Sequence, residues 1–295
     1  MSNIQPKSVH TIKALLSLLL VLLFIPKTWA DVNITTTIRP LQLIAEAIVQ
    51  DKGSVTAIVS ASQSPHHYSM SPSDRIALAQ ADLLIWIGPE FETYLADFFT
   101  QRSSSEHVLT LLQADNIILH NIVDGQVDAH LWLDSRNAIL IAELITQQAS
   151  KLDKQNEALF KENLNQFKTQ INELNRETEA TLSVSPRKSY AVYHNAYQYF
   201  EKQFGLNHRF AMLVDPEVQP GIQEIISVRR RFQEQSPECL FIEPDSNLDL
   251  VNTTLAGHQL STTTIDLLGV RITSRQGAYI ELMENMARDF ASCLY

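Results

Sequence analysis

The sequence is short of the residues that cross-link small secreted domains and of the charges that attract nucleic acids. Its 295 residues include only two cysteines, and its 23 lysines and arginines are outnumbered by 33 aspartates and glutamates. A chain this acidic is repelled by phosphate backbones and by anionic lipid surfaces, so we expect no nucleic-acid partner. The metalloprotease motif H-E-x-x-H is also missing. The acidic balance instead favours cations.

Long apolar runs are missing too, except near the start of the chain. Residues 14–25 are apolar apart from Ser17 and follow a weakly basic segment. Twelve helical residues span about 18 Å, which is shorter than the roughly 30 Å of a membrane core. Thr28 and Ala30 supply small residues at the −3 and −1 positions of a cleavage site. The pattern predicts a signal peptide (1–30) that is cleaved after Ala30.

The absence of cysteine near this leader excludes a lipid-attachment site. We therefore expect the mature protein to be free in an exported compartment, most simply a bacterial periplasm. Loss of the leader removes three lysines and leaves 20 basic against 33 acidic residues, a formal charge of −13. In an oxidising compartment an even number of cysteines favours a disulfide, here between Cys239 and Cys293. Two buried thiols or a thiolate metal site remain the alternatives.

Strand-like and helix-like segments alternate on both sides of a helical middle. Strands are predicted at 32–38, 55–59, 83–87, 107–112, 189–193, 209–214, 239–242 and 260–265. Helices are predicted at 41–49, 72–80, 91–99, 196–204, 219–235 and 276–293. This alternation predicts an α/β fold of two lobes, each with a parallel sheet flanked by helices.

Two longer helices are predicted between the lobes. Asp134 can cap one over 135–149, and Asp153 can cap another over 154–182. In the second, apolar residues recur at spacings of 4, 3, 4 and 3, at Phe160, Leu164, Phe167, Ile171 and Leu174. No proline or glycine interrupts it, so we expect a long rigid helix that joins the lobes.

Three histidines stand in short aromatic-flanked motifs: His66 in S-P-H-H-Y, His130 in D-A-H-L-W-L and His194 in Y-A-V-Y-H-N-A-Y. His66 and His194 follow predicted strands, as does Asp266, and His130 ends a loop before the linking helices. Ligands of α/β lobes lie beyond the carboxyl ends of strands, and neutral imidazole is a common metal ligand. These four residues therefore predict a metal site in the cleft between the lobes. For Asp266, capping of the turn at 267–269 is the alternative.

The predicted organisation follows from these elements. It comprises a signal peptide (1–30), an N-terminal metal-binding lobe (31–136), linking helices (137–182) and a C-terminal metal-binding lobe (183–295).

Several longer motifs carry a family resemblance. They are H-H-Y-S-M-S-P-S-D (66–74), A-D-L-L-I-W-I-G-P-E (81–90), H-L-W-L (130–133), Y-H-N-A-Y-Q-Y-F-E-K-Q-F-G-L (193–206), P-E-V-Q-P-G (216–221), E-P (243–244) and I-D-L-L-G (265–269). Across 31–295 the chain resembles the solute-binding proteins of ABC-type zinc and manganese importers, most closely the ZnuA-like zinc members. The resemblance implies a metal held in the cleft by His66, His130 and His194, with Asp266 as the candidate fourth ligand. The cysteine pair also resembles the disulfide of zinc-specific members.

The chain departs from the family pattern around the ligands. Pro65 stands where zinc members often carry a glutamate, and His67 and Asn195 replace aspartates. The His- and acid-rich loop that is common before H-L-W-L is missing. The fourth ligand is therefore open between Asp266, His67 and water.

Ligand chemistry favours zinc, because Zn²⁺ accepts three imidazoles and one oxygen whereas manganese prefers more oxygen. We expect a monomeric periplasmic protein that captures Zn²⁺ as cargo, with high affinity, and delivers it to an ABC-type permease in the inner membrane. It is not expected to be an enzyme. The alternatives are a receptor for manganese or another divalent metal, a metallochaperone, a surface adhesin, and a zinc-dependent hydrolase with Glu243 as the one acid to consider as general base.

Overall fold

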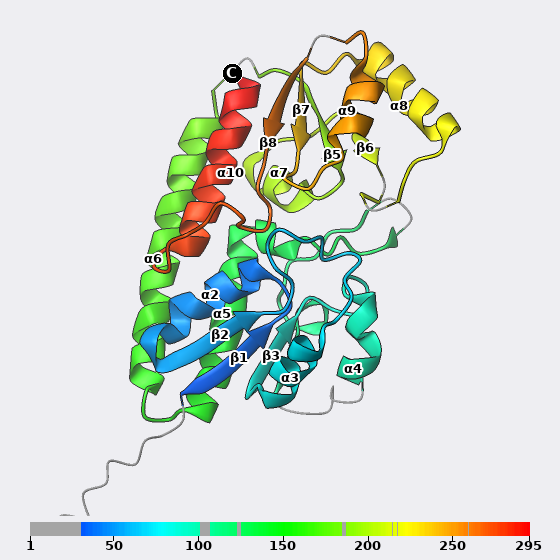
Figure 1. The fold of residues 1–295 in the computed structure, drawn as a ribbon. Helices are drawn as coiled ribbons and strands as arrows, with labels where there is room; N and C mark the ends of the chain where they lie inside the picture. The colour runs from blue at the N-terminus through cyan, green and yellow to red at the C-terminus, as the bar shows by residue number, and fades with distance from the viewer. Residues whose placement is uncertain are drawn as a thin grey trace, which may run out of the picture. The chain divides into compact units, whose positions relative to one another are not determined.

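Two four-stranded parallel sheets organise the chain (Figure 1). The computed structural model describes residues 31–100, 107–122, 125–184, 187–213, 215–216, 218–258 and 260–295. The first sheet has the order β2-β1-β3-β4, with β1 (Val32–Thr36), β2 (Gly53–Ala57), β3 (Leu83–Trp86) and β4 (Val108–Thr110). The second has the order β6-β5-β7-β8, with β5 (Tyr190–His194), β6 (Ala211–Leu213), β7 (Cys239–Ile242) and β8 (Ser261–Thr264). The predicted α/β fold with two parallel sheets is confirmed. The predicted signal peptide (1–30) lies outside the described residues.

The central strands β3, β5 and β7 are buried along their whole length because helices cover both faces of each sheet. In β3, Leu83 and Ile85 belong to one hydrophobic cluster, whereas Leu84 and Trp86 belong to another. Successive side chains of a strand point to opposite faces, so these two clusters lie on the two sides of the sheet.

Most of the helices that cover the sheets agree with the predicted segments, and α4 and α9 are the exceptions. They are α2 (Arg39–Val49), α3 (Pro72–Gln80), α4 (Ala96–Thr100), α5 (Ser135–Leu152), α6 (Glu157–Leu182), α7 (Gln198–Phe204), α8 (Ile222–Gln235), α9 (Leu248–Leu255) and α10 (Ala278–Leu294). Asp134 caps α5 by accepting the backbone N–H of Arg136, as predicted. Among the described residues, no helix combines the length and the apolar character that crossing a membrane requires.

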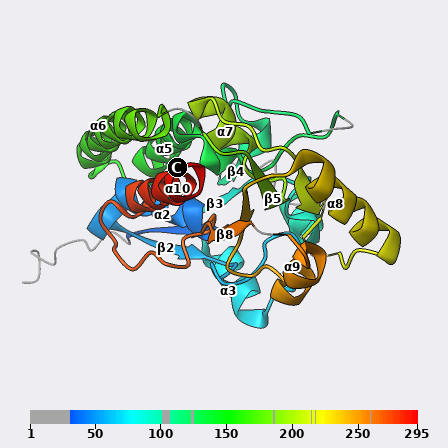
Figure 2. The ribbon, with the colours of Figure 1, turned by 90° about the horizontal axis from the view of Figure 1, so that it is seen from above.

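The long helix α6 joins the two lobes, as predicted. It packs against α2, α5, α7 and α10, and α6 and α10 lie side by side in Figures 1 and 2. With 26 residues it is about 39 Å long. It begins at Glu157, three residues later than predicted, because Asp153 instead accepts the backbone N–H groups of Gln155 and Asn156 in a turn.

Two further helical predictions need correction. The segment 91–99 is not one helix but a 3₁₀ turn (Thr93–Leu95) followed by the short α4. Glu92 explains the break, because its carboxylate accepts the backbone N–H groups of Ile87 and Gly88 and so holds a tight turn. Helix α9 was not predicted at all. It has only eight residues, and its capping residue Asn247 is its clearest signal.

A single buried cluster runs through both lobes. It includes Ile34 of β1, Phe167 of α6 and Phe290 of α10. The lobes therefore share one hydrophobic core and are not two independent bodies on a flexible linker.

A disulfide joins Cys239 of β7 to Cys293 of α10, with Cα atoms 6.0 Å apart, which confirms the predicted pairing.

Candidate metal centre

The three predicted histidines converge from three separate segments. His66 lies in the loop after β2, His130 directly precedes the 3₁₀ turn Leu131–Leu133, and His194 is the last residue of β5. Their ring centroids are 5.4 to 5.7 Å apart. One nitrogen from each ring lies within 4.8 Å of the others. Tetrahedral zinc needs nitrogens about 3.4 Å apart, so small side-chain adjustments bring the triad to that geometry.

His66 is held in its neutral form by its surroundings. The ring of Phe91 packs edge-on against it with centroids 5.0 Å apart. Burial lowers the pKa of His66 to about 2, and the neighbouring His130 and His194 push the pKa in the same direction. The imidazole therefore needs to lose no proton before it coordinates a cation.

His130 is oriented by a buried carboxylate. Its Nδ1 lies 2.8 Å from Oδ1 of Asp128, and its backbone N–H donates to the same oxygen. A carboxylate only accepts, so Nδ1 carries the proton and Nε2 remains for a metal. Asp128 was not predicted to have this role, although its place two residues before a candidate ligand was the available signal.

His194 has a similar partner directly after the neighbouring strand β7. Its Nδ1 lies 3.3 Å from Oε1 of Glu243, a charge contact rather than a well-aligned hydrogen bond. Its Nε2 is buried and has no hydrogen-bond partner among the described residues. Burial is the largest single influence and lowers the pKa of His194, but the contact with Glu243 and the charges of Asp245 and Asp128 together outweigh it, so the pKa is raised above its ordinary value. A buried nitrogen without a partner fits a cation that the triad would hold.

Asp266 has a different environment from the three histidines. Its carboxylate accepts four backbone N–H groups, from Leu268, Gly269, Val270 and Arg271, at 2.7 to 3.2 Å. It lines the same cavity as the triad, but the described residues bring only the three histidines into a common metal-sized group. The geometry is that of the turn-capping alternative.

His67 points away from its neighbour His66. Its Nε2 lies 3.3 Å from Oδ2 of Asp215, and more than half of its side chain is exposed. The contact joins the loop after β2 to the loop after β6 and so bridges the lobes outside the triad.

A cavity of about 230 Å³ opens from the triad. Residues from both lobes line it, among them Ser64, Trp132, Tyr193 and Leu268. Trp132 is fixed there because its indole N–H donates to the carbonyl of Leu267 at 3.0 Å. The volume exceeds that of a bare ion and leaves room for several water molecules.

Comparison with known proteins identifies the family of this chain. The family model described as "Zinc-uptake complex component A periplasmic" matches residues 34–293. The chain belongs to this family. The high-affinity zinc uptake system protein ZnuA of Yersinia pestis is 29% identical over 296 residues, which cover 91% of this chain and 93% of the relative. The protein of the same name from Brucella abortus is 27% identical over 305 residues, covering 89% and 91%.

Solved structures share the fold. A crystal structure of ZnuA aligns with a TM-score of 0.76 at 22% identity and covers 90% of this chain and 99% of that one. The laminin-binding protein Lmb of Streptococcus agalactiae, described as a bifunctional protein with adhesin and metal transporting activity, aligns with a TM-score of 0.77 at 18% identity, covering 90% and 99%. At these identities the likeness establishes the two-lobed architecture.

Proposed function

We propose that this protein is a periplasmic zinc receptor that binds one Zn²⁺ through His66, His130 and His194 and delivers it to an ABC-type permease. The observation that carries the proposal is the convergence of three imidazoles, two of which face buried carboxylates through Nδ1. Such carboxylate–histidine pairs orient the ring and make the remaining nitrogen a better metal ligand. The relatives named as zinc uptake proteins support the same cargo.

Zinc fits this donor set better than manganese does. Three nitrogens and one open position suit tetrahedral zinc, whereas manganese prefers carboxylate and carbonyl oxygens. Because Asp266 is engaged by four N–H groups, we propose that the fourth position faces the cavity and takes water.

A receptor accounts for the carboxylates better than a hydrolase does. Glu243 accepts hydrogen bonds from the hydroxyls of Tyr197 and Ser246 and faces Nδ1 of His194. It therefore lies behind a ligand instead of beside the open position, where a general base would have to activate water. We propose that zinc is cargo and that no bond is made or broken.

The proposal extends to the processing, the oligomeric state and the domain division of the chain. The signal peptide is cleaved after Ala30, the mature chain is a monomer, and its division is an N-terminal lobe (31–136), linking helices (137–182) and a C-terminal lobe (183–295).

The test is a competition titration of the mature chain with zinc and a chromophoric chelator. The wild type should bind one zinc, and His194→Ala should lose at least about a hundredfold in affinity, because two imidazoles do not make a stable zinc site. His107→Ala is the matched control, since His107 contacts the carbonyl of Asp82 and belongs to no metal-sized group among the described residues. Unchanged affinity in His194→Ala would overturn the assignment.

The metal content of protein purified from the periplasm is a second test. Zinc, not manganese, should be found in it.

A further inference from the structure

Helix α7 connects two of the three histidines physically. It begins four residues after His194, and its first two residues, Gln198 and Tyr199, reach Asp128, the carboxylate that orients His130. Gln198 donates from Nε2 to Oδ2 of Asp128 at 3.2 Å. Tyr199 donates from its hydroxyl to the carbonyl of Asp128 at 2.7 Å.

Gln198 and Tyr199 bind atoms of Asp128 that His130 does not contact, namely Oδ2 and the backbone carbonyl oxygen. Oδ1 serves the ring and backbone of His130, so Gln198 engages the other oxygen. The Tyr199 side chain is fully buried, and its hydroxyl also accepts the backbone N–H of His120. The orientation of Asp128 therefore depends on a helix of the other lobe.

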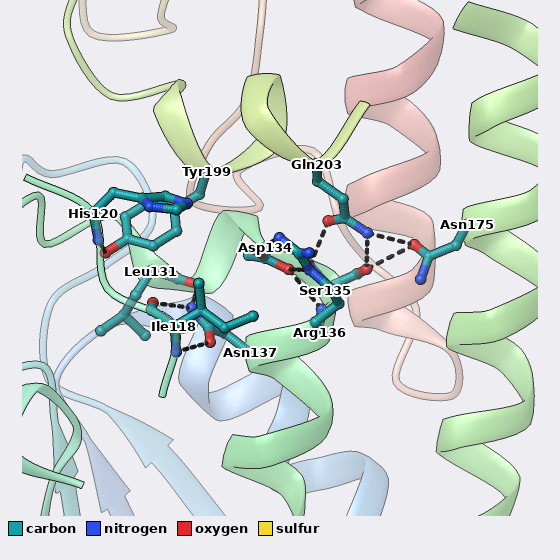
Figure 3. Close-up of polar contacts among 10 residues, drawn as sticks. All are labelled: Ile118, His120, Leu131, Asp134, Ser135, Arg136, Asn137, Asn175, Tyr199 and Gln203. Atoms are coloured by element: carbon teal, nitrogen blue, oxygen red, sulfur yellow. Dashed lines mark hydrogen bonds and ion pairs between the residues drawn. The ribbon is translucent and has the colours of Figure 1, made fainter. Parts of the chain in front are cut away.

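The far end of α7 is fixed as well. Gln203 donates from Nε2 to the hydroxyl of Ser135 at 2.7 Å and to Oδ1 of Asn175 at 3.1 Å. Its Oε1 accepts the backbone N–H of Ser135. Figure 3 shows Gln203 reaching Ser135 of α5 and Asn175 of α6. Helix α7 is thus held at its start by Asp128 and near its end by the start of α5 and the long helix α6.

We propose that Gln198 and Tyr199 are positioning residues that couple His130 to His194. The proposal rests on the proposed function, because it concerns how the zinc ligands are arranged. When α7 keeps its position, Asp128 presents Oδ1 to His130 and the strand end presents His194. A shift of α7 moves both ligands together, so two of the three zinc bonds strengthen or weaken as a unit. Outer partners of this kind control the orientation of a ligand without touching the metal.

The test compares Gln198→Ala and Tyr199→Phe with the wild type in the same zinc titration. Each variant should lose about tenfold in zinc affinity, the lower end of the range for partners outside the ligand layer. Two matched controls should retain wild-type affinity. Gln223→Ala removes an exposed glutamine from the first turn of α8, and Tyr295→Phe removes a tyrosine hydroxyl that donates to the carbonyl of Leu182.

A double-mutant cycle with Asp128→Asn separates positioning from general destabilisation. If Gln198 acts through Asp128, Gln198→Ala should have little further effect in the Asp128→Asn background. NMR of ¹⁵N-labelled histidine in the zinc-free protein adds a direct readout. The Nδ1–H form of His130 should dominate in the wild type and become mixed in Gln198→Ala.

Additive losses in the cycle, or an unchanged His130 tautomer, would overturn the positioning role. Thermal unfolding of each zinc-free variant shows whether it is folded, and the NMR readout needs no zinc. A wild type that binds no zinc would defeat the proposed function instead, so the two failures are distinguishable.

Discussion

The carboxylate of Glu243 should set the pH at which the protein holds zinc. The substitution Glu243→Gln keeps the size of the side chain and removes its charge. In the wild type, burial lowers the pKa of His194, but Glu243, 3.3 Å away, acts with the charges of Asp245 and Asp128 to raise the pKa above its ordinary value. Without that charge only the burial effect and weaker distant charges remain. The pKa of His194 should therefore fall.

The sign of the pH effect follows from competition between zinc and protons. Only neutral imidazole coordinates, so zinc must displace the proton of His194 whenever the pH is below its raised pKa. The wild type should hold zinc fully above that pKa and lose about tenfold in affinity per pH unit below it from this proton. His66 adds no competition, because burial keeps its pKa at about 2.

Glu243→Gln should change both the zinc affinity at high pH and the pH at which the affinity begins to fall. At pH 8 it should bind zinc about 10- to 100-fold more weakly, because the ligand loses its ionised partner. Its affinity should begin to fall only at lower pH than in the wild type, so the two curves should approach each other on acidification.

Competition titrations between pH 5.5 and 8.5 test this expectation. The exposed variant Glu234→Gln serves as the control and should follow the wild-type curve. Parallel curves for the wild type and Glu243→Gln would refute the idea that Glu243 raises the pKa of His194.

Three further outcomes are expected. Peptide mapping without reductant should find Cys239 linked to Cys293, and reduction should lower the free energy of unfolding by about 4 kcal/mol, given a sequence separation of 54 residues. Phe91→Ala should weaken zinc binding and destabilise the fold by about 3–5 kcal/mol, because this buried ring packs against both His66 and His130; chemical denaturation measures the second effect. Small-angle scattering should show little change in overall dimensions when zinc is added, and a large closure would contradict a rigid α6.

The convergence of the three histidines could be predicted from sequence because each stands near the end of a recognisable strand or in a local motif. Their carboxylate partners could not be predicted as securely. Strands β5 and β7 pair in parallel with Val192 opposite Phe241, and continuing this register places His194 opposite Glu243. Strand pairing and register are tertiary facts, so the same acid read from the sequence was only a candidate general base.

Tertiary contacts also explain why the helix predicted over 91–99 is wrong. The apolar spacing of 91–99 favours a helix, but the spacing does not reveal that Glu92 is needed to hold the turn after β3. Asp266 follows a strand as a ligand would, and the sequence does not reveal the four N–H groups that converge on its carboxylate. These N–H groups would compete with a metal for the carboxylate, and Asp266 as the fourth ligand stays an untested prediction.

The shared core also determines how zinc can leave. Ile34, Phe167 and Phe290 lie in one buried cluster that spans the lobes and α6. Exposing each such side chain costs about 1.5–3 kcal/mol, so an opening that exposed five of them would cost about 10 kcal/mol, comparable to the whole stability of a typical domain. His66, by contrast, is only partly buried in an irregular loop. Movement of this loop exposes far less apolar surface, so zinc release should begin with His66, while α7 keeps His130 and His194 together.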